Sequence, residues 1–321
     1  MHDGMEVEVK SGLLGDINLP LAQITDRFGV LLRDVLPPEE VRANAARHPE
    51  RVAYPVRAVH RALAFAIDRP GTVVVGFGAL ALYGLPFFVE GQDTVLMDKN
   101  CREHQAAGAH RPSIVRQTGA VGEVWDLRHS GWKLRASEPH AALVQSLRLL
   151  WREEVAWHVQ AIEGLDRRTV RAIQLVDASR RHLGLDPARV LRAARSQLNQ
   201  RWICDVLAHS SPYADSPKET ELRLLLGDVI QKYGLTLQEQ VVVRRGKEIV
   251  TTLDLAIKEP RIGVMYDGAH HGEDRQWKKD AYINSMLVAE QWAPLRFTSV
   301  SLATAAAVVE EVVVKRLGIT L

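Results

Sequence analysis

The chain has 321 residues, of which 46% are hydrophobic and 25% charged, and its formal net charge at pH 7 is +2. This is the composition of a globular protein, and the length predicts two or three domains. The small net charge excludes a uniformly basic surface, so any contact with nucleic acid must come from a local patch.

No apolar run is long and uncharged enough to span a membrane, and the first residues lack the basic start and apolar run of a signal peptide. The two cysteines, Cys101 and Cys204, lie far apart in the sequence. They fit a reduced cytosolic protein and rule out a zinc site built from cysteines. We therefore expect a cytoplasmic protein with no membrane partner.

Residues 1–70 contain short patterns of helical spacing and form the first predicted domain. We expect helices over 19–28, 39–47 and 55–67, with Pro37-Pro38 separating the first two. Short helices joined by short turns suit a helix-turn-helix module, in its winged form or not. Any small helical bundle has the same pattern, so both interpretations stay open.

Residues 71–210 form the second predicted domain, a mixed α/β and helical region. A buried strand at 73–76 leads into a small-residue helix, and further short strands are expected at 94–97, 113–116 and 121–125. The helical part after residue 137 is rich in arginine. Such charges usually form the solvated face of helices, but Arg189, Arg192 and Arg195, at i, i+3 and i+6, could contact phosphates.

A small and polar loop at 208–215 marks the best domain boundary, and residues 211–321 form the third predicted domain. Its expected order is helix, three-stranded meander, helix, strand, helix. Two apolar runs, 249–257 and 262–266, are separated by four residues that suit a hairpin turn.

Each of these two runs ends near an aspartate. Because side chains alternate along a strand, we expect Leu253, Leu255 and Ile257 on one face and Asp254 on the other. By the same rule Met265 should share a face with Asp267. Paired in a hairpin, the runs would bring both acids to one rim of the sheet, where like charges need a cation between them. The alternative is a strand-end Asp254 and an ordinary Asp267-Gly268 turn.

Four motifs in series carry a resemblance. They are Ser216-Pro217-Lys218-Glu219-Thr220, Leu253-Asp254-Leu255-Ala256, Tyr266-Asp267-Gly268-Ala269-His270-His271 and Trp292-Ala293-Pro294-Leu295-Arg296-Phe297. Together they resemble the endonuclease-like domain of many actinobacterial proteins, which is related to the very-short-patch-repair (Vsr) endonucleases and to the wider PD-(D/E)xK nuclease superfamily. The resemblance covers about the last third of the chain. Residues 78–86, Gly-Ala-Leu-Ala-Leu-Tyr-Gly-Leu-Pro, resemble a segment of AbiE-type antitoxins that follows a winged helix-turn-helix.

The resemblance implies an α/β fold with a restriction-endonuclease-like C-terminal domain. It implies a DNA endonuclease of repair or defence that depends on Mg²⁺ or Mn²⁺. Asp254 and a backbone carbonyl near Tyr266 would hold the metal, with Asp267, His270 and His271 in supporting roles. Glu219 would face the site, although a capping box at Ser216 explains the same residue equally well.

Candidate DNA contacts lie in two places. Arg244, Arg245 and Lys247 form a basic hairpin tip, and Lys278 and Lys279 begin the helix after the second aspartate. Phosphates attract such residues, but a solvated helical face is the commoner role of the two lysines.

One position departs from the family. Most relatives carry Glu immediately before Tyr-Asp-Gly, and here that residue is Met265, whose thioether is a poor ligand for Mg²⁺. Two alternatives therefore stay open: a catalytically degenerate, antitoxin-like DNA-binding regulator, and a nuclease that cleaves RNA. A homodimer is compatible with each.

Overall fold

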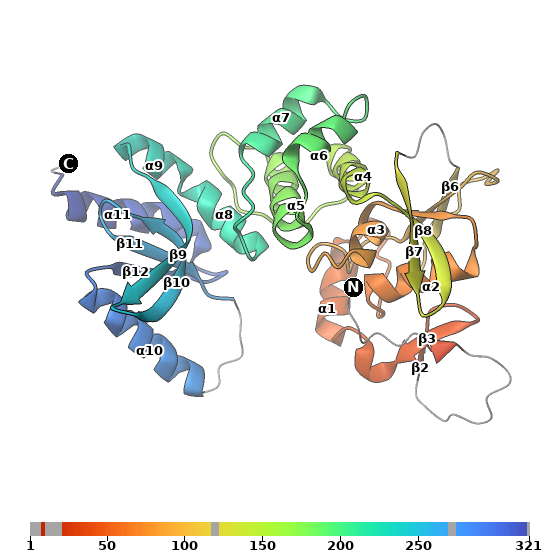
Figure 1. The fold of residues 1–321 in the computed structure, drawn as a ribbon, viewed down its shortest axis with the longest axis horizontal. Coiled ribbons are helices and arrows are strands. Elements are labelled where there is room, and N and C mark those ends of the chain that lie inside the picture. The colour runs from red at the N-terminus through yellow and green to blue at the C-terminus, as the bar shows by residue number, and fades with distance from the viewer. Residues whose placement is uncertain (1–7, 10–20, 117–121, 269–273, 320–321) are drawn as a thin grey trace. The chain divides into compact units, whose positions relative to one another are not determined.

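The computed structural model describes residues 8–9, 21–116, 122–268 and 274–319. The chain forms two compact units (Figure 1). The first comprises Met1–Trp157 and Ala178–Ala208, and the second comprises His158–Asp177 and His209–Leu321. The second unit thus resumes at His209, two residues before the expected boundary at 211. It also includes His158–Asp177, which the predicted division assigned to the second domain.

The first unit begins with a small antiparallel sheet. Its strands, β1 (Glu8–Val9), β2 (Leu21–Gln23) and β3 (Phe28–Leu31), have the order β1-β3-β2. The helix predicted over 19–28 is therefore wrong in its described part. Thr25 Oγ1 accepts hydrogen bonds from the backbone N–H groups of Arg27 and Phe28. Such hydroxyl-centred turns compete with helix formation.

A five-stranded mixed sheet forms the main layer of the first unit, in the order β6-β5-β4-β8-β7. Its elements are α1 (Pro38–Arg47), α2 (Ala58–Asp68), β4 (Val73–Val75), α3 (Gly76–Leu82), β5 (Val95–Asp98), β6 (Ser113–Arg116), β7 (Val124–His129) and β8 (Trp132–Ser137). The helices predicted over 39–47 and 55–67 are confirmed as α1 and α2. A Cβ at Gly78 would lie 3.1 Å from Val74, so β4 and α3 pack closely at this glycine.

Helices complete the first unit. They are α4 (Pro139–Trp151), α6 (Pro187–Ala193), α7 (Gln200–Ala208) and, shared with the second unit, α5 (Arg167–Leu183). Glu138 caps α4 by accepting from the N–H groups of His140 and Ala141, and Pro139 occupies the first turn, where a missing N–H costs nothing. The predicted arginine-rich helical region is confirmed.

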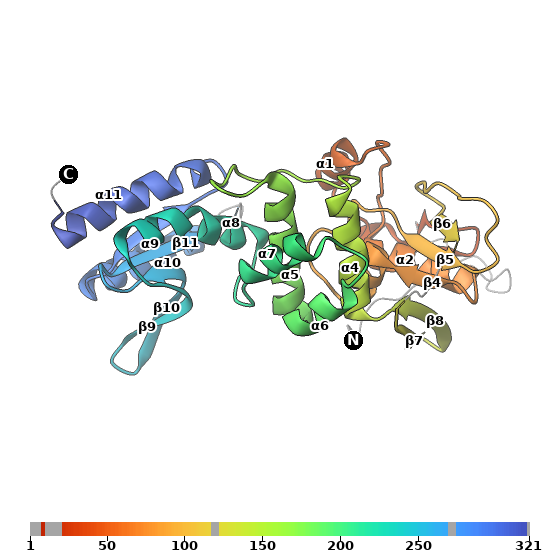
Figure 2. The same ribbon diagram turned by 90° about the horizontal axis from the view of Figure 1, so that it is seen from above.

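The second unit is built on a four-stranded sheet of order β12-β11-β10-β9. Its elements are α8 (Pro217–Leu225), α9 (Gly227–Tyr233), β9 (Leu237–Arg245), β10 (Glu248–Ile257), β11 (Ile262–Tyr266), α10 (Asp274–Ala289), β12 (Ala293–Phe297) and α11 (Ala305–Leu317). β9, β10 and β11 form an antiparallel meander, and β12 pairs with β11 in parallel. The predicted order of elements is confirmed, and the β9–β10 hairpin projects from the body of the unit (Figure 2).

Both faces of this sheet are buried. Leu255, Ile257 and Val264 pack with residues of α8, α9 and α11, and Met265 packs on the other face with Ile283 and Leu287 of α10. The expectation of one apolar face and one polar face is therefore wrong. Met265 and Val264 point to opposite faces of the sheet, as alternation predicts. The Met265 side chain is nevertheless only 5% exposed and belongs to an apolar cluster. A helix crossing over the second face explains the difference, because it turns that face into core.

The face predicted for Leu253 is also wrong. Leu253 packs with Met265, whereas Leu255 packs in the opposite cluster. The β9–β10 pairs on either side of Asp254 are Leu253 with Val241 and Leu255 with Glu239. Between those two β9 partners, Gln240 has a φ of 51°, in the left-handed region, so β9 departs from extended strand geometry opposite this change of face.

The chain is a mixed α/β protein. Within the described residues no helix is both long enough and apolar enough to cross a membrane.

Candidate functional site

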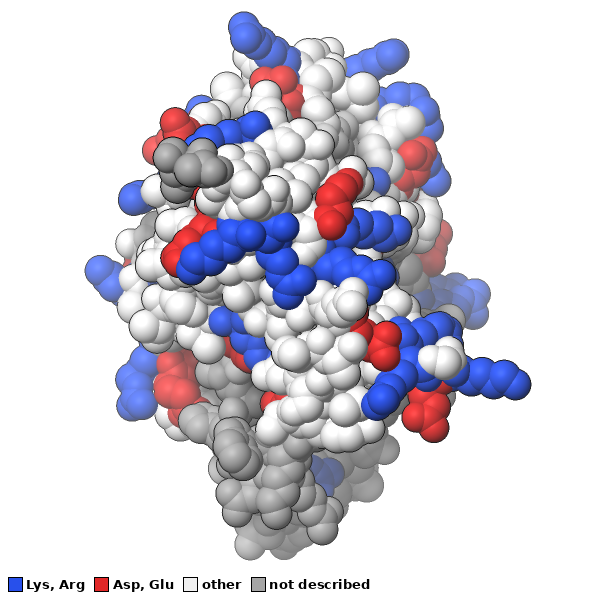
Figure 3. All heavy atoms as spheres, turned by 90° about the vertical axis from the view of Figure 1, so that its left-hand side faces the viewer, with Lys and Arg blue, Asp and Glu red and all other residues white. Residues whose placement is uncertain are grey.

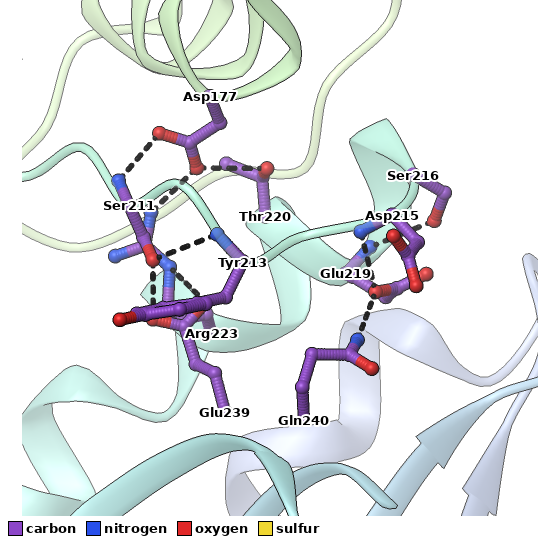
Figure 4. Close-up of polar contacts among 10 residues, drawn as sticks. All are labelled: Asp177, Ser211, Tyr213, Asp215, Ser216, Glu219, Thr220, Arg223, Glu239 and Gln240. Carbon is purple, nitrogen blue, oxygen red and sulfur yellow. Dashed lines mark hydrogen bonds and ion pairs between the residues drawn. The ribbon is translucent and has the colours of Figure 1, made fainter. Parts of the chain in front are cut away.

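Glu219 is fixed at the start of α8. Ser216 caps this helix through Oγ, which accepts from the Glu219 N–H at 3.3 Å, and Pro217 follows at the first helical position. The Glu219 carboxylate bends back and accepts from the Asp215 N–H at 2.9 Å. Its side chain also accepts from Gln240 Nε2 at 3.2 Å (Figure 4). Glu219 can therefore take part in the helix cap and face the candidate site at the same time.

Asp254 lies on β10, just beyond the point at which its pairing with β11 ends. That pairing covers Leu255 to Ile257, and Asp254 Oδ2 accepts instead from the Tyr266 N–H at 2.7 Å. A side chain thus takes the backbone group that the ladder would have used. This bond fixes the carboxylate at the end of β11, next to the Tyr266 peptide.

Gln240 links the two acids. It lies opposite Asp254 across the β9–β10 ladder, and its amide reaches Glu219. Its left-handed conformation is an unusual one for glutamine, and strained backbone of this kind concentrates at functional sites. The fold therefore gathers acids from α8 and β10, which are 35 residues apart in the sequence by subtraction of 219 from 254.

The two carboxyl groups repel each other. Burial, and then the charge of Asp254, raise the pKa of Glu219 to about 7. Burial, together with repulsion from Asp215 and Asp267, raises the pKa of Asp254 to about 6, against the lowering effect of the Tyr266 N–H. Within the described residues neither Glu219 nor Asp254 forms an ion pair with Lys, Arg or His.

Asp267 differs, because a cation holds it. Arg296 Nη1 donates to Asp267 Oδ1 at 2.8 Å, and Arg296 Nη2 lies 3.6 Å from Asp280. The Asp267 N–H donates to the Phe297 carbonyl at 2.8 Å, which continues the β11–β12 pairing past the end of β11. Asp267 therefore lies close enough to repel Asp254, but one carboxylate oxygen of Asp267 is already paired with Arg296.

The basic hairpin tip lies apart from these acids. Arg244 and Lys247 are exposed, and Arg245 Nε lies 3.7 Å from a carboxylate oxygen of Glu290, the residue that follows α10. Asp254 lies six positions along β10 from Glu248, which is about 20 Å at the usual strand rise. Figure 3 shows basic and acidic side chains interspersed on the face of the described residues that it presents.

The remaining predicted residues lie outside what the structure describes. His270 and His271 fall in the undescribed segment 269–273, and the side chains of Lys278 and Lys279 are also undescribed, although both residues belong to α10. Among the described residues, no three His, Cys, Asp or Glu side chains are grouped so as to hold a metal ion.

A second carboxylate cluster adjoins the first (Figure 4). Asp177 of α5 is 1% exposed and accepts from the Ser211 N–H, from Thr220 Oγ1 and from Arg223 Nη2, the last at 2.7 Å. Arg223 Nε also lies 3.5 Å from Glu239. Every acid here meets a donor or a cation, so we interpret this cluster as structural.

Sequence reasoning missed Asp215 and the role of Gln240. Asp215 was assigned only to the polar loop, although its position immediately before a Ser-Pro helix start was a usable signal for a group near the helix N-terminus. The strained φ of Gln240 has no sequence signal, since glutamine is not a residue that favours left-handed backbone.

Comparisons of the chain with family models, with curated proteins and with solved structures find no match.

Proposed function

We propose that the second unit is a metal-dependent nuclease with a restriction-endonuclease-like fold, which hydrolyses phosphodiester bonds of DNA. The observation that carries this proposal is the pair of inward-facing carboxylates, Glu219 and Asp254. Burial raises the pKa of both, the charge of Asp254 adds to the rise at Glu219, and neither forms an ion pair with a cation among the described residues. Like charges held this close cost stability unless a function uses them.

The donor set suits Mg²⁺ or Mn²⁺. Both carboxylates offer hard oxygen atoms, and Mg²⁺ is usually held by one or two carboxylates, with water and substrate phosphates completing its shell. Asp254 and Glu219 would hold the ion, and the Tyr266 carbonyl is the nearest candidate backbone ligand. When bound, the ion would activate water and neutralise charge that develops on the phosphate.

The chain's own residues prepare this site. The Tyr266 N–H fixes one oxygen of Asp254, and the Asp215 N–H and the Gln240 amide fix Glu219. Arg296 holds Asp267 aside and would leave Asp254 as the principal anion.

Cleavage of labelled duplex, single-stranded and mismatched DNA with Mg²⁺ or Mn²⁺ tests the proposal. We expect Asp254→Asn and Glu219→Gln to abolish cleavage. The matched control is Asp228→Asn, the same loss of charge at an exposed position of α9 in the same unit. Cleavage by the wild type that survives Asp254→Asn would contradict the assignment, and cleavage of RNA alone would change the substrate class.

A specific observation favours a second candidate, a nucleic-acid-binding regulator that no longer cleaves. Met265 stands where the resembled family carries Glu, and it is buried among apolar side chains. Asp267 is neutralised by Arg296. Both features remove ligands from the site. Purified wild type that binds DNA but cleaves no substrate with either metal would support this candidate.

A further inference from the structure

The first unit contains an open groove of about 550 Å³. It runs between the β2–β3 turn, the C-terminal end of α2 and the loop before β6. The lining is rich in cationic side chains: Arg27, Arg69, His110 and Arg111. Asp26 and Asp68 line it too, so the groove has a positive balance without being purely basic.

The basic side chains of the groove differ in their hydrogen-bond and ion-pair partners. Arg27 Nη1 lies 3.2 Å from Asp68 Oδ1, and His110 Nδ1 donates to the Gln23 carbonyl at 3.1 Å. Arg69 and Arg111 are exposed, and neither side chain has an ion pair with a described residue. Two guanidinium groups in one groove thus have their donors available to an anion, and Asp68, one of the two acids in the lining, is already paired with Arg27.

An exposed aromatic ring adjoins these cations. Trp132 begins β8 at the tip of the β7–β8 hairpin and is 37% exposed. Its ring packs edge-on against Phe28, and the guanidinium of Arg27 lies 5.8 Å from its centroid. On the same strand, Arg135 donates to the carbonyl of Gly71, two residues beyond Arg69. The hairpin therefore continues the basic surface of the groove.

We propose that this groove, with Trp132 at its edge, binds single-stranded nucleic acid. Spaced guanidinium groups match the repeated phosphates of a backbone, and an aromatic face allows a base to stack in any sequence context. A duplex hides its base faces, which leaves the tryptophan without a partner. The proposal goes beyond hydrolysis in the second unit, because all of these residues belong to the first.

The test is fluorescence anisotropy with the full chain, a labelled mixed-sequence single-stranded DNA and the matching duplex. EDTA is present throughout, so the result is independent of the proposed nuclease activity. We expect Arg69→Glu/Arg111→Glu to weaken single-strand binding about tenfold or more and to flatten its salt dependence, since each lost phosphate contact lowers the slope by about 0.7. Trp132→Leu, which keeps the apolar contact with Phe28, should weaken it about fivefold or more.

The matched control is Arg42→Glu/Arg47→Glu, an equal charge reversal at exposed positions of α1, a helix of the same unit that does not line the groove. This variant should bind like the wild type, and thermal melting should show every variant folded. Three results would overturn the proposal: loss of binding in the α1 variant but not in the groove variant, a wild-type preference for duplex, or no binding of single strands. Loss of cleavage in Asp254→Asn tests the nuclease separately.

Discussion

Two carboxylate clusters of the second unit share one helix and have opposite electrostatics. Glu219 and Thr220 are neighbours on α8, yet Glu219 feels the charge of Asp254, whereas Thr220 donates a hydrogen bond to Asp177 (Figure 4). Burial raises the carboxyl pKa at both, to about 6 at Asp177 and about 7 at Glu219. At Asp177 the charge of Arg223 opposes this rise, whereas at Glu219 the charge of Asp254 adds to it.

The difference separates a structural acid from a candidate functional one. Asp177 accepts from two neutral donors, the Ser211 N–H and the Thr220 hydroxyl, and from the cationic Arg223, so its burial is compensated. Glu219 and Asp254 accept only from neutral N–H donors, while the charge of Asp254 raises the pKa of Glu219 and those of Asp215 and Asp267 raise the pKa of Asp254. Arg296 lowers the pKa of Asp254, but its ion pairs are with Asp267 and Asp280, so the burial of the two acids is compensated only in part. Burial alone does not distinguish the two clusters, but the sign of the neighbouring charge does.

The largest expected effect concerns the fragment boundary. A fragment that starts at residue 211, the predicted domain boundary, would lack Asp177 and the residues that donate hydrogen bonds to Glu221. That acid is fully buried and accepts from the Gln160 N–H and Gln174 Nε2. We expect 211–321 to remain unfolded and 158–321 to fold, as judged by circular dichroism and NMR dispersion. A dispersed spectrum for the shorter fragment would show that the structural cluster is dispensable.

Asp177→Ala should be the most damaging single change. The side chain of Arg223 is only 14% exposed, and the substitution removes its closest carboxylate. We therefore expect a loss of about 3–5 kcal/mol in the free energy of unfolding. Urea denaturation measures this loss. The control, Asp228→Ala at an exposed site, should change stability by no more than about 0.5 kcal/mol. Equal effects of the two changes would remove the contrast between the clusters.

Met265→Glu should be destabilising by about 3 kcal/mol, because a new carboxylate would enter the apolar cluster beneath α10. The resemblance, in which most relatives carry Glu at this position, would instead predict a gain in metal affinity. Met265→Leu, which keeps an apolar side chain, should cost less than about 1.5 kcal/mol. A glutamate variant that is as stable as the wild type and binds Mg²⁺ more tightly would place residue 265 in the site after all.

Glu219→Gln should stabilise the metal-free protein. The folded-state pKa of Glu219, about 7, exceeds its ordinary value of 4.5, so between these pH values the folded chain holds a proton that the unfolded chain has released. Stability from this group is therefore present at low pH and is lost as pH rises through that window. In EDTA near pH 8 we expect a gain of up to about 3 kcal/mol. Denaturation at several pH values measures it, and a wild type with no loss over this window would contradict it.

Much of the second unit could be predicted from the sequence. The order of its elements follows from alternation, helical spacing and the Ser216-Pro217 helix start, and the structure confirms it. The separation of Leu253 and Leu255 onto opposite faces could not be predicted, because strict alternation places both on one face and the left-handed conformation of Gln240 has no sequence signal. The burial of Met265 depends on α10 crossing the sheet, which is a tertiary event.

The candidate site was predictable in part for the same reasons. Asp254 and Glu219 were identified from the four motifs, and the structure brings them together electrostatically. The ion pair of Asp267 with Arg296 was not foreseen, since 29 positions separate the two residues. Nor was the Asp177 cluster, because its members come from α5, a loop and α8, and no local pattern links them.

The central claim is that the Glu219–Asp254 cluster, unlike the Asp177 cluster, is built to receive a cation. Isothermal titration of the full chain with Mg²⁺ and with Mn²⁺ tests it most directly, using the wild type, Asp254→Asn and the control Asp228→Asn. We predict saturable binding to the wild type and to the control, and its loss in Asp254→Asn. Binding that survives Asp254→Asn, or a wild type that takes up neither ion, would contradict the account.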